Sequence, residues 1–188
     1  MTSEAGLWNV ANALTMVRLV LVPVFIVSFL AGGTAWRLAA LATFCVASAT
    51  DVLDGRLARS RGLVTDFGKI ADPVADKALT GAALVCLSAL GELPWWVTAL
   101  IMFREIGVTV LRFWVIRRGV IAASRGGKLK TLLQVIAICL YILPPALSTP
   151  GIVRVLFMAA AVVVTLVTGV DYVQQAMRLR RSEPAAGP

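Results

Sequence analysis

Six long apolar stretches follow one another along the chain, and short polar or glycine- and proline-containing segments separate them. They cover residues 13–31, 35–60, 68–90, 94–117, 128–147 and 151–177. A helix needs about 20 mostly apolar residues to cross a bilayer. The segments Ala31–Gly33, Gly91–Pro94 and Ser148–Gly151 are short and carry glycine or proline, which is typical of turns. The pattern therefore predicts an all-α polytopic membrane protein with six transmembrane helices.

Two of the stretches have apolar cores that are too short to span a bilayer alone. Leu38–Ala49 has 12 residues and Ala78–Leu90 has 13. Each reaches spanning length only when the adjoining charged segment is added. Such segments are either short buried helices or helices whose ends reach a polar cavity at the membrane face.

Basic residues are concentrated on one side of the predicted membrane. When the ends of the stretches are assigned alternately, one side receives only Arg37 and Arg154. The other side receives Arg56, Arg59, Arg61, Lys69, Lys77, Arg112, Arg117, Arg118, Arg125, Lys128, Lys130, Arg178, Arg180 and Arg181. Excess Lys and Arg marks the cytoplasmic side of a membrane protein. We therefore expect cytoplasmic termini and a polar cavity at the cytoplasmic face.

Composition agrees with a membrane protein. Hydrophobic residues make up 59% of the chain and charged residues 15%, against about 45–50% and about 25% in soluble domains. This excludes a disordered protein and disfavours a soluble enzyme. The net charge of +8 indicates an anionic membrane surface or anionic substrates rather than nucleic acid.

The two ends of the chain give weaker signals. The first stretch lacks a preceding basic region and contains Arg18, so we do not expect a cleaved signal peptide. Residues 2–12 are equally well explained as an interfacial helix with Trp8 at the membrane boundary or as a frayed terminus. We expect residues 1–181 to form a single membrane domain and residues 182–188 to be a disordered tail.

The available side-chain chemistry is limited. The chain has no histidine, and Cys45, Cys86 and Cys139 lie far apart in apolar stretches. This spacing makes neither a metal site nor a disulfide pattern. Any catalysis must therefore use carboxylates, basic groups or hydroxyls.

Four aspartates lie where the second and third stretches meet the cytoplasmic face, namely Asp51, Asp54, Asp72 and Asp76. A charge at the membrane centre costs about 2.5–3.5 kcal/mol on insertion scales. Two carboxylates 4 Å apart repel by roughly 4 kcal/mol at an effective dielectric of 20. Four together need protons or cations. Oxygen ligands without histidine or a thiolate pattern favour Mg²⁺, with Mn²⁺ or Ca²⁺ as alternatives.

Helical spacing places these aspartates on two helix faces. One face carries Asp51, Asp54 and Ala58, and the other carries Gly68, Asp72 and Asp76. Antiparallel helices can bring the faces together, and the small residues leave room for a ligand. Taken singly, Asp72 before Pro73 is also explained as an N-cap, and Asp51 with Asp54 as partners of Arg56 and Arg59 at a solvated helix end. The combination favours a metal site.

At this point the residues resemble a known family. The run Asp51-x2-Asp54-Gly55-x2-Ala58-Arg59-x8-Gly68-x3-Asp72-x3-Asp76 matches the signature of the CDP-alcohol phosphotransferases at every fixed position. Three other segments resemble the phosphatidylglycerophosphate synthases of that family: Asn12-Ala-Leu-Thr15-x2-Arg18 with Pro23, Pro94–Thr98 followed by Arg104-Glu105, and Gly127–Thr131. One departure is Val10-Ala11 before Asn12, where many members have a proline.

The resemblance implies a reaction and a setting. Glycerol 3-phosphate would displace CMP from CDP-diacylglycerol and give phosphatidylglycerophosphate, the precursor of phosphatidylglycerol and cardiolipin. The enzyme would be a homodimer in a bacterial-type cytoplasmic membrane, with its active site facing the cytoplasm.

The resemblance also implies roles for residues. Two divalent ions would be held by Asp51, Asp54, Asp72 and Asp76, and Asp76 would also act as the general base. Donor contacts would come from Asn12, Thr15, Gly55, Ala58, Arg59, Thr65 and Gly68. Asn12 is equally well explained as the N-cap of the first helix. Because histidine is absent, no Ser–His or Cys–His pair can form a covalent intermediate, and we expect direct displacement.

The acceptor's phosphate needs further cations, and the candidates are Arg104, Arg112, Arg118, Lys128 and Lys130. The glycines Gly126 and Gly127 would let the loop before Lys128 approach a phosphate closely. Ordinary positive-inside anchoring also explains several of these basic residues. Arg104 and Glu105 stand in mid-span, where charge is expensive, and are expected to pair with other helices and shape the pocket.

Three alternative functions stay open. The nearest is an enzyme of the same family that uses inositol phosphate, serine, phosphatidylglycerol or another alcohol, and only the Arg104-Glu105 and Gly127–Thr131 segments argue against it. A divalent-cation transporter would also use membrane carboxylates, but the aspartates cluster at one face and only Glu92 is acidic near the other. A purely structural membrane protein is the third alternative.

Overall fold

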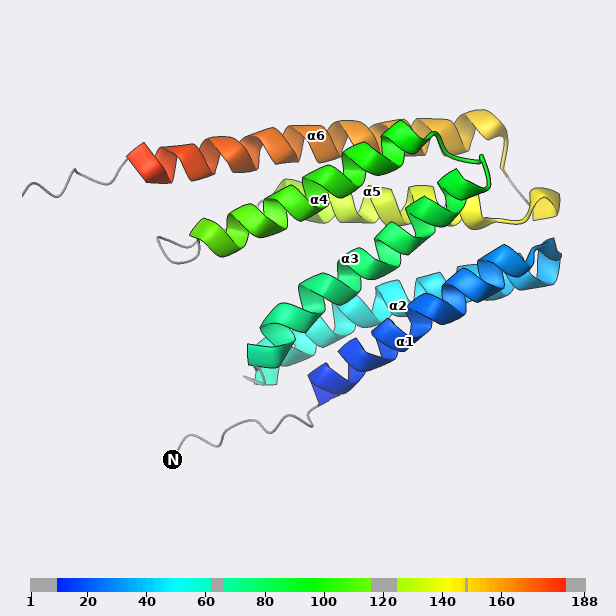
Figure 1. The fold of residues 1–188 in the computed structure, drawn as a ribbon, viewed down its shortest axis with the longest axis horizontal. Helices are drawn as coiled ribbons and strands as arrows, with labels where there is room; N and C mark the ends of the chain where they lie inside the picture. Colours follow the sequence, from blue (N-terminus) through cyan, green and yellow to red (C-terminus); the bar gives the residue numbers. More distant parts are fainter. Residues whose placement is uncertain (1–9, 62–65, 116–124, 148, 182–188) are drawn as a thin grey trace, which may run out of the picture. The chain divides into compact units, whose positions relative to one another are not determined.

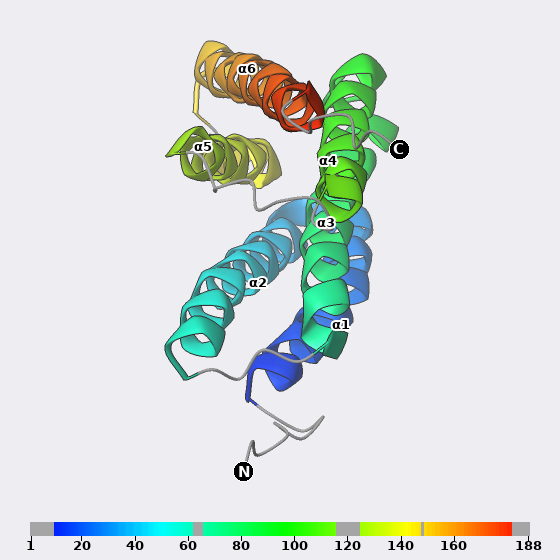
Figure 2. The same ribbon diagram turned by 90° about the vertical axis from the view of Figure 1, so that its left-hand side faces the viewer.

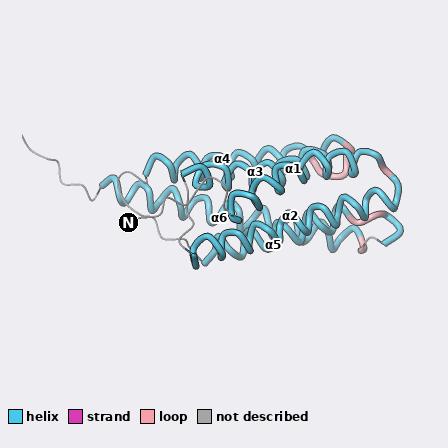
Figure 3. Tube along the Cα trace, turned by 90° about the horizontal axis from the view of Figure 1, so that it is seen from below, coloured by secondary structure: helices cyan, strands magenta, loops and turns pink. Residues whose placement is uncertain are grey.

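A computed structural model describes the backbone of residues 10–61, 66–115, 125–147 and 149–181, and the side chains of residues 13–50, 74–75, 77–111, 126–147 and 149–177. Over these ranges the chain forms six α-helices and no strand (Figures 1 and 3). The helices are α1 (Val10–Ala31), α2 (Gly33–Arg61), α3 (Asp66–Ala89), α4 (Trp95–Val115), α5 (Arg125–Ile142) and α6 (Gly151–Arg181). The prediction of an all-α protein is confirmed.

The chain divides into two compact units, and their boundary crosses α5 between residues 137 and 138. The first unit contains residues 1–94 and 138–149, and the second contains residues 95–137 and 150–188. The predicted single domain over residues 1–181 stays a prediction. The predicted disordered tail and residues 2–9 of the predicted interfacial helix lie outside the described residues.

In the first unit, α1 packs against both α2 and α3 (Figures 1 and 2). Its centre is aromatic: the ring centroids of Phe25 and Phe29 on α1 are 5.7 Å apart, and those of Phe25 and Phe44 on α2 are 5.9 Å apart. Ala47 on α2 and Ala83 on α3 are fully buried. Small residues let membrane helices approach closely, so van der Waals contact holds these three together.

Glycines make the turns between helices of this unit. Gly32 alone separates α1 from α2, and it has a φ of 73°. Gly91, which follows α3, also has a φ of 73°. Residues with a side chain rarely adopt this left-handed conformation, so glycine ends both helices sharply. The predicted turns at Ala31–Gly33 and Gly91–Pro94 are thereby confirmed.

Helix α5 ends at Ile142, short of the predicted residue 147. Pro144 and Pro145 follow, and residues Pro145–Leu147 form a single 3₁₀ turn. Proline has no N–H to continue the helix, and it disfavours helical geometry in the residue before it. The predicted C-terminal end of this helix was therefore wrong.

A charge cluster joins the elements of the first unit at the end where α1 meets α2. The guanidinium of Arg37 on α2 pairs with Oε1 of Glu92 and reaches the carbonyl oxygen of Leu143 at 3.5 Å. It also lies 4.9 Å above the ring centroid of Phe29. We call these four residues the Arg37 cluster. It connects α1 and α2 with the segments that follow α3 and α5.

In the second unit, α4 packs against α6. Ile101 on α4 and Met158 and Ala161 on α6 lie in the interior. Phe103 on α4 points outward and is 82% exposed. A large apolar side chain that is exposed in this way suits contact with lipid better than contact with water.

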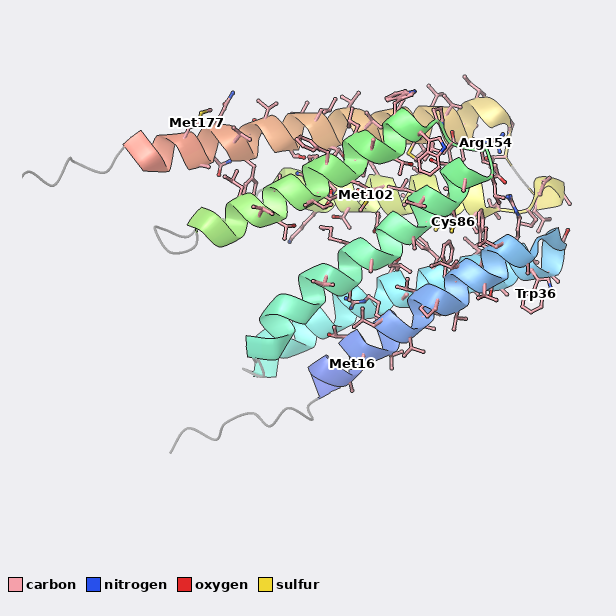
Figure 4. All side chains as sticks on the ribbon, in the orientation of Figure 1. Met16, Trp36, Cys86, Met102, Arg154 and Met177 are labelled. Atoms are coloured by element: carbon pink, nitrogen blue, oxygen red, sulfur yellow. The ribbon has the colours of Figure 1, made fainter. Side chains whose placement is uncertain are left out.

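Within the part of the chain that the structure describes, two helices are long and apolar enough to cross a membrane, over Ala13–Ala31 and Gly151–Met177, whereas the apolar part of α3 at Lys77–Ala89 is shorter. Their outward sides carry exposed apolar residues, among them Met16 and Met177, which Figure 4 labels. These surfaces support a membrane protein. The number of crossings and the side of the termini stay predictions.

Candidate active site

The four aspartates lie on two consecutive helices of the first unit. Asp51 and Asp54 belong to the C-terminal half of α2, and Asp72 and Asp76 to the N-terminal half of α3. Both segments are helical, so each pair occupies one side of its helix. Their side chains lie outside the described part of the structure, and their roles stay predictions. Four carboxylates remain a suitable donor set for hard divalent cations.

The buried faces of two helices lead toward the aspartate positions. On α2, Phe44 and Ala47 are buried, and position 51 follows them at the spacing of one helix face. On α3, position 72 shares a face with Ala75 and Leu79, which are also buried. The buried apolar face of each helix thus leads, along the backbone, to an aspartate position. That these helix ends reach a polar cavity stays a prediction.

Helix α1 adds two polar residues at the same end of the unit. Thr15 is 1% exposed and Arg18 is fully buried, and both share a helix face with Phe25. Thr15 was an expected donor contact, and it is the one member of that set whose side chain the structure describes. The remaining positions fall outside the described side chains: Asn12, Gly55, Ala58, Arg59, Thr65 and Gly68.

Arg18 is a residue to which sequence reasoning assigned no role. It is the one charged residue within α1. A buried arginine in an apolar helix is expensive unless it serves an interaction. That isolation is the sequence signal that could have identified it.

The second unit contains a largely buried charge network on three helices. Nη2 of Arg104 on α4 donates a hydrogen bond to Oγ1 of Thr168 on α6 at 2.8 Å. Nη1 of Arg104 lies 3.2 Å from Oε1 of Glu105, and Nζ of Lys130 on α5 contacts the same oxygen. The side chains of Glu105 and Lys130 are 3% and 7% exposed. We call these four residues the Glu105 network.

A glycine on α6 gives Arg104 its place. A Cβ atom at Gly169 would lie 3.1 Å from Cγ and 3.6 Å from Nε of Arg104. The arginine stem therefore lies directly against the backbone of α6. Thr168 is fixed as well, because its hydroxyl is 2.7 Å from the carbonyl oxygen of Val164 in its own helix.

The expected acceptor contacts thus occupy different environments. Arg104 and Lys130 come together through Glu105, whereas Lys128 is exposed on α5. The side chain of Arg112 and the whole of Arg118 lie outside the described residues. The expectation that Arg104 and Glu105 pair with other helices is confirmed by Lys130 and Thr168.

Comparison with known proteins identifies the family. Residues 8–167 match the family described as CDP-alcohol phosphatidyltransferase. The chain belongs to this family. The matched segment runs from the N-terminal region into α6 and contains all four aspartates and the Glu105 network except Thr168. The resemblance noted in the sequence is confirmed.

Individual relatives match over most of the chain. A protein of Mycobacterium tuberculosis named "Probable phosphatidylglycerophosphate synthase" is 55% identical over 179 residues, which cover 93% of this chain and 85% of the relative. Two others are named "CDP-diacylglycerol--glycerol-3-phosphate 3-phosphatidyltransferase". The Bacillus subtilis protein is 40% identical over 70% of this chain and 75% of its own length. The Escherichia coli K12 protein is 37% identical over 90% of this chain and 95% of its own length.

Sequence reasoning missed Thr168 and Gly169 on α6, which the contacts of Arg104 reveal. Both residues lie in an otherwise strongly apolar helix. Small and hydroxyl-bearing residues are enriched where membrane helices contact one another. The Thr165, Thr168 and Gly169 set was therefore a readable signal for a helix contact, although its partner on α4 was not readable.

Proposed function

We propose that this protein transfers the phosphatidyl group of CDP-diacylglycerol to glycerol 3-phosphate, giving phosphatidylglycerophosphate and CMP. The observation that carries this proposal is the 55% identity over 93% of the chain to a relative named as a phosphatidylglycerophosphate synthase. Two more distant relatives, whose names state the same transfer, support it.

The setting is a bacterial-type cytoplasmic membrane that the six helices cross, with both termini on the cytoplasmic side. The exposed apolar surfaces of α1 and α6 support this placement. The diacylglycerol chains of the donor stay in the bilayer while its nucleotide end reaches the aspartates. A groove between helices, open sideways to lipid, is therefore required.

Family membership implies divalent metal ions, and two are proposed, with Mg²⁺ favoured and Mn²⁺ as the alternative. Asp51, Asp54, Asp72 and Asp76 would hold them. When bound, such ions neutralise the diphosphate and stabilise the CMP oxygen as it departs. The acidic end of the first unit supports this assignment.

The aspartate at position 76 also acts as the general base. It takes the proton from the attacking hydroxyl of glycerol 3-phosphate, whose oxygen bonds to the phosphorus of the phosphatidyl group while the bond to CMP breaks. A carboxylate that also binds metal is a weak base, so substrate positioning supplies much of the rate. Transfer is direct, because the chain has no histidine to activate a serine or cysteine.

Donor and acceptor meet different parts of the protein. Thr15 and the signature residues of α2 and α3 contact the donor. The acceptor's phosphate contacts basic residues drawn from Arg104, Arg112, Arg118, Lys128 and Lys130. The partly buried Arg104 and the buried Lys130 lie on two helices and share one carboxylate oxygen of Glu105, and this pairing of two cations supports the role. The enzyme is proposed to act as a homodimer.

An acceptor survey tests the proposal. Membranes that contain the protein are incubated with CDP-diacylglycerol, Mg²⁺ and one acceptor at a time, and CMP release is measured. Glycerol 3-phosphate should give the fastest release. Preference for inositol phosphate, serine or phosphatidylglycerol would overturn the assigned acceptor. Trapping of a phosphatidyl-enzyme with labelled donor would overturn direct transfer.

A further inference from the structure

The Glu105 network contains two candidate acceptor contacts, Arg104 and Lys130. It also contains Glu105 and Thr168, which were not candidates for contacting the acceptor. We infer that Glu105, Thr168 and Gly169 are positioning residues, which hold Arg104 and Lys130 as a preformed pair for the acceptor's phosphate. The inference rests on the proposed function. It assigns helix α6, which carries none of the signature residues, a part in selecting the acceptor.

The charges of the Glu105 network favour an anionic ligand. Arg104 and Lys130 belong to different helices, yet both contact the same oxygen of Glu105. Two cations at this separation repel each other, and the carboxylate between them offsets the repulsion. The three side chains together carry one net positive charge. A phosphate dianion is the ligand class that complements two cations held so close together.

Two contacts fix the orientation of the Arg104 guanidinium. Its two terminal nitrogens each carry two hydrogens. One hydrogen of Nη2 is directed to Thr168 and one of Nη1 to Glu105. Fixing both nitrogens sets the plane of the group and leaves each with a second hydrogen. Two parallel N–H groups match two phosphate oxygens, which a lysine cannot do alone.

Close packing against α6 also fixes the stem of Arg104. Gly169 lets the stem of Arg104 lie against α6, where a Cβ atom would be 3.1 Å from Cγ. Nε of Arg104 is buried and has no hydrogen-bond partner among the described residues. The helix thus covers the stem side of the arginine. Among the described contacts, the second hydrogens of Nη1 and Nη2 are the ones left to donate to a ligand.

Replacing Gly169 tests whether the packing of the Arg104 stem against α6 is needed for acceptor binding. In Gly169→Ala the added methyl displaces Arg104, and we expect the KM for glycerol 3-phosphate to rise about 10-fold, the loss of roughly one charged hydrogen bond. The kcat and the KM for CDP-diacylglycerol should change less than about twofold, since the same displacement leaves the donor side intact. Gly107→Ala is the matched control, because Gly107 on α4 has open space around its Cβ position.

Replacing Thr168 tests whether its hydrogen bond orients the Arg104 guanidinium, and it does so without adding bulk. Thr168→Val removes the hydroxyl that accepts from Arg104, and it should also raise the KM for glycerol 3-phosphate about 10-fold. Thr168→Ser keeps the hydroxyl and should restore the parental KM. Thr43→Val is the matched control, because the Thr43 hydroxyl donates to the carbonyl oxygen of Ala39 within its own helix.

The measurements use the full-length protein in detergent with CDP-diacylglycerol and Mg²⁺, together with calorimetric titration of glycerol 3-phosphate. Support is a selective rise in acceptor KM and Kd that serine at position 168 reverses. A fall in kcat, or an equal rise in both KM values, overturns the inference while the transferase function stands. Should Gly169→Ala not fold, the valine and serine variants decide. If the parental enzyme releases no CMP when glycerol 3-phosphate is the acceptor, the proposed function itself is overturned.

Discussion

The Arg37 cluster and the Glu105 network are both partly or fully buried charge groups, but their charges balance differently. Arg37 meets one carboxylate, one backbone carbonyl and one aromatic ring, so its single charge is satisfied locally. In the Glu105 network one carboxylate oxygen serves two cations. A balanced group needs no ligand and holds helices together. Where two cations share one carboxylate oxygen, a bound anion would lower the electrostatic cost of keeping them together in a membrane protein.

The largest effect is expected outside both groups, and it sets the scale for them. Asp76→Asn removes the proposed base, so CMP release should fall at least about 100-fold, to the level of inactivity, because general-base catalysis contributes at least that much. Asp54→Asn, which removes a proposed metal ligand, should do the same.

Asp171→Asn is the matched control for these variants, since Asp171 is exposed on α6 and has no assigned role. Its rate of CMP release should equal that of the parent. If Asp76→Asn keeps most of its rate, the assigned base is wrong.

The next largest effect separates the two charge groups directly. Glu105→Gln removes the charge between Arg104 and Lys130, and the KM for glycerol 3-phosphate should rise about 10-fold as the cations move apart. Glu92→Gln makes the same chemical change in the Arg37 cluster and should leave that KM unchanged. Steady-state kinetics of the two variants measures the difference. Equal changes in acceptor KM would remove the distinction between the groups.

Changes in the Arg37 cluster, in contrast, should lower the stability of the protein and leave acceptor binding unchanged. Arg37→Met removes an ion pair, a carbonyl contact and a cation–π contact, and should lower the free energy of unfolding by about 1–3 kcal/mol, a range reduced because Glu92 is partly exposed. Thermal inactivation in detergent should then begin at lower temperature, with kinetics at 25 °C unchanged. Arg37→Lys keeps the charge, so its inactivation temperature should lie between those of the parent protein and Arg37→Met. A loss of acceptor affinity in Arg37→Met would contradict a purely structural role.

The smallest effect concerns two lysines of α5. Lys130 is buried against Glu105, whereas Lys128 is exposed. Lys128→Ala should raise the KM for glycerol 3-phosphate by about threefold or less, because an exposed ionic contact contributes at most about 1 kcal/mol. Lys130→Ala should raise it considerably more. A larger effect at Lys128 would shift the phosphate site away from the Glu105 network.

The sequence predicted well those features that are local or carry a fixed pattern. The apolar stretches identified the helices, and the glycines at 32 and 91 identified turns that need a left-handed residue. The spacing of the aspartates identified the family. The end of α5 was misplaced because apolarity was followed past Ile142, although Pro144 and Pro145 already indicated a helix end.

The contacts between distant segments were not predictable in this way. Glu105 was expected to pair with another helix, but nothing in its neighbours names Lys130, which lies 25 residues away. The place of Arg104 against Gly169 likewise depends on how α4 and α6 pack. Hydropathy shows that a helix has a buried side, but many rotations and pairings of apolar helices satisfy it equally.

The one-residue connection at Gly32 has a geometric consequence for the whole first unit. Counting back along α1 from this glycine gives Asn12 after 20 residues, and counting forward along α2 gives Asp51 after 19. At a rise of 1.5 Å per residue, both positions lie about 28–30 Å along their helices from the turn. That length equals the hydrocarbon thickness of a bilayer, about 30 Å. The hairpin of α1 and α2 therefore places Asn12 and Asp51 about one membrane thickness from the bend at Gly32.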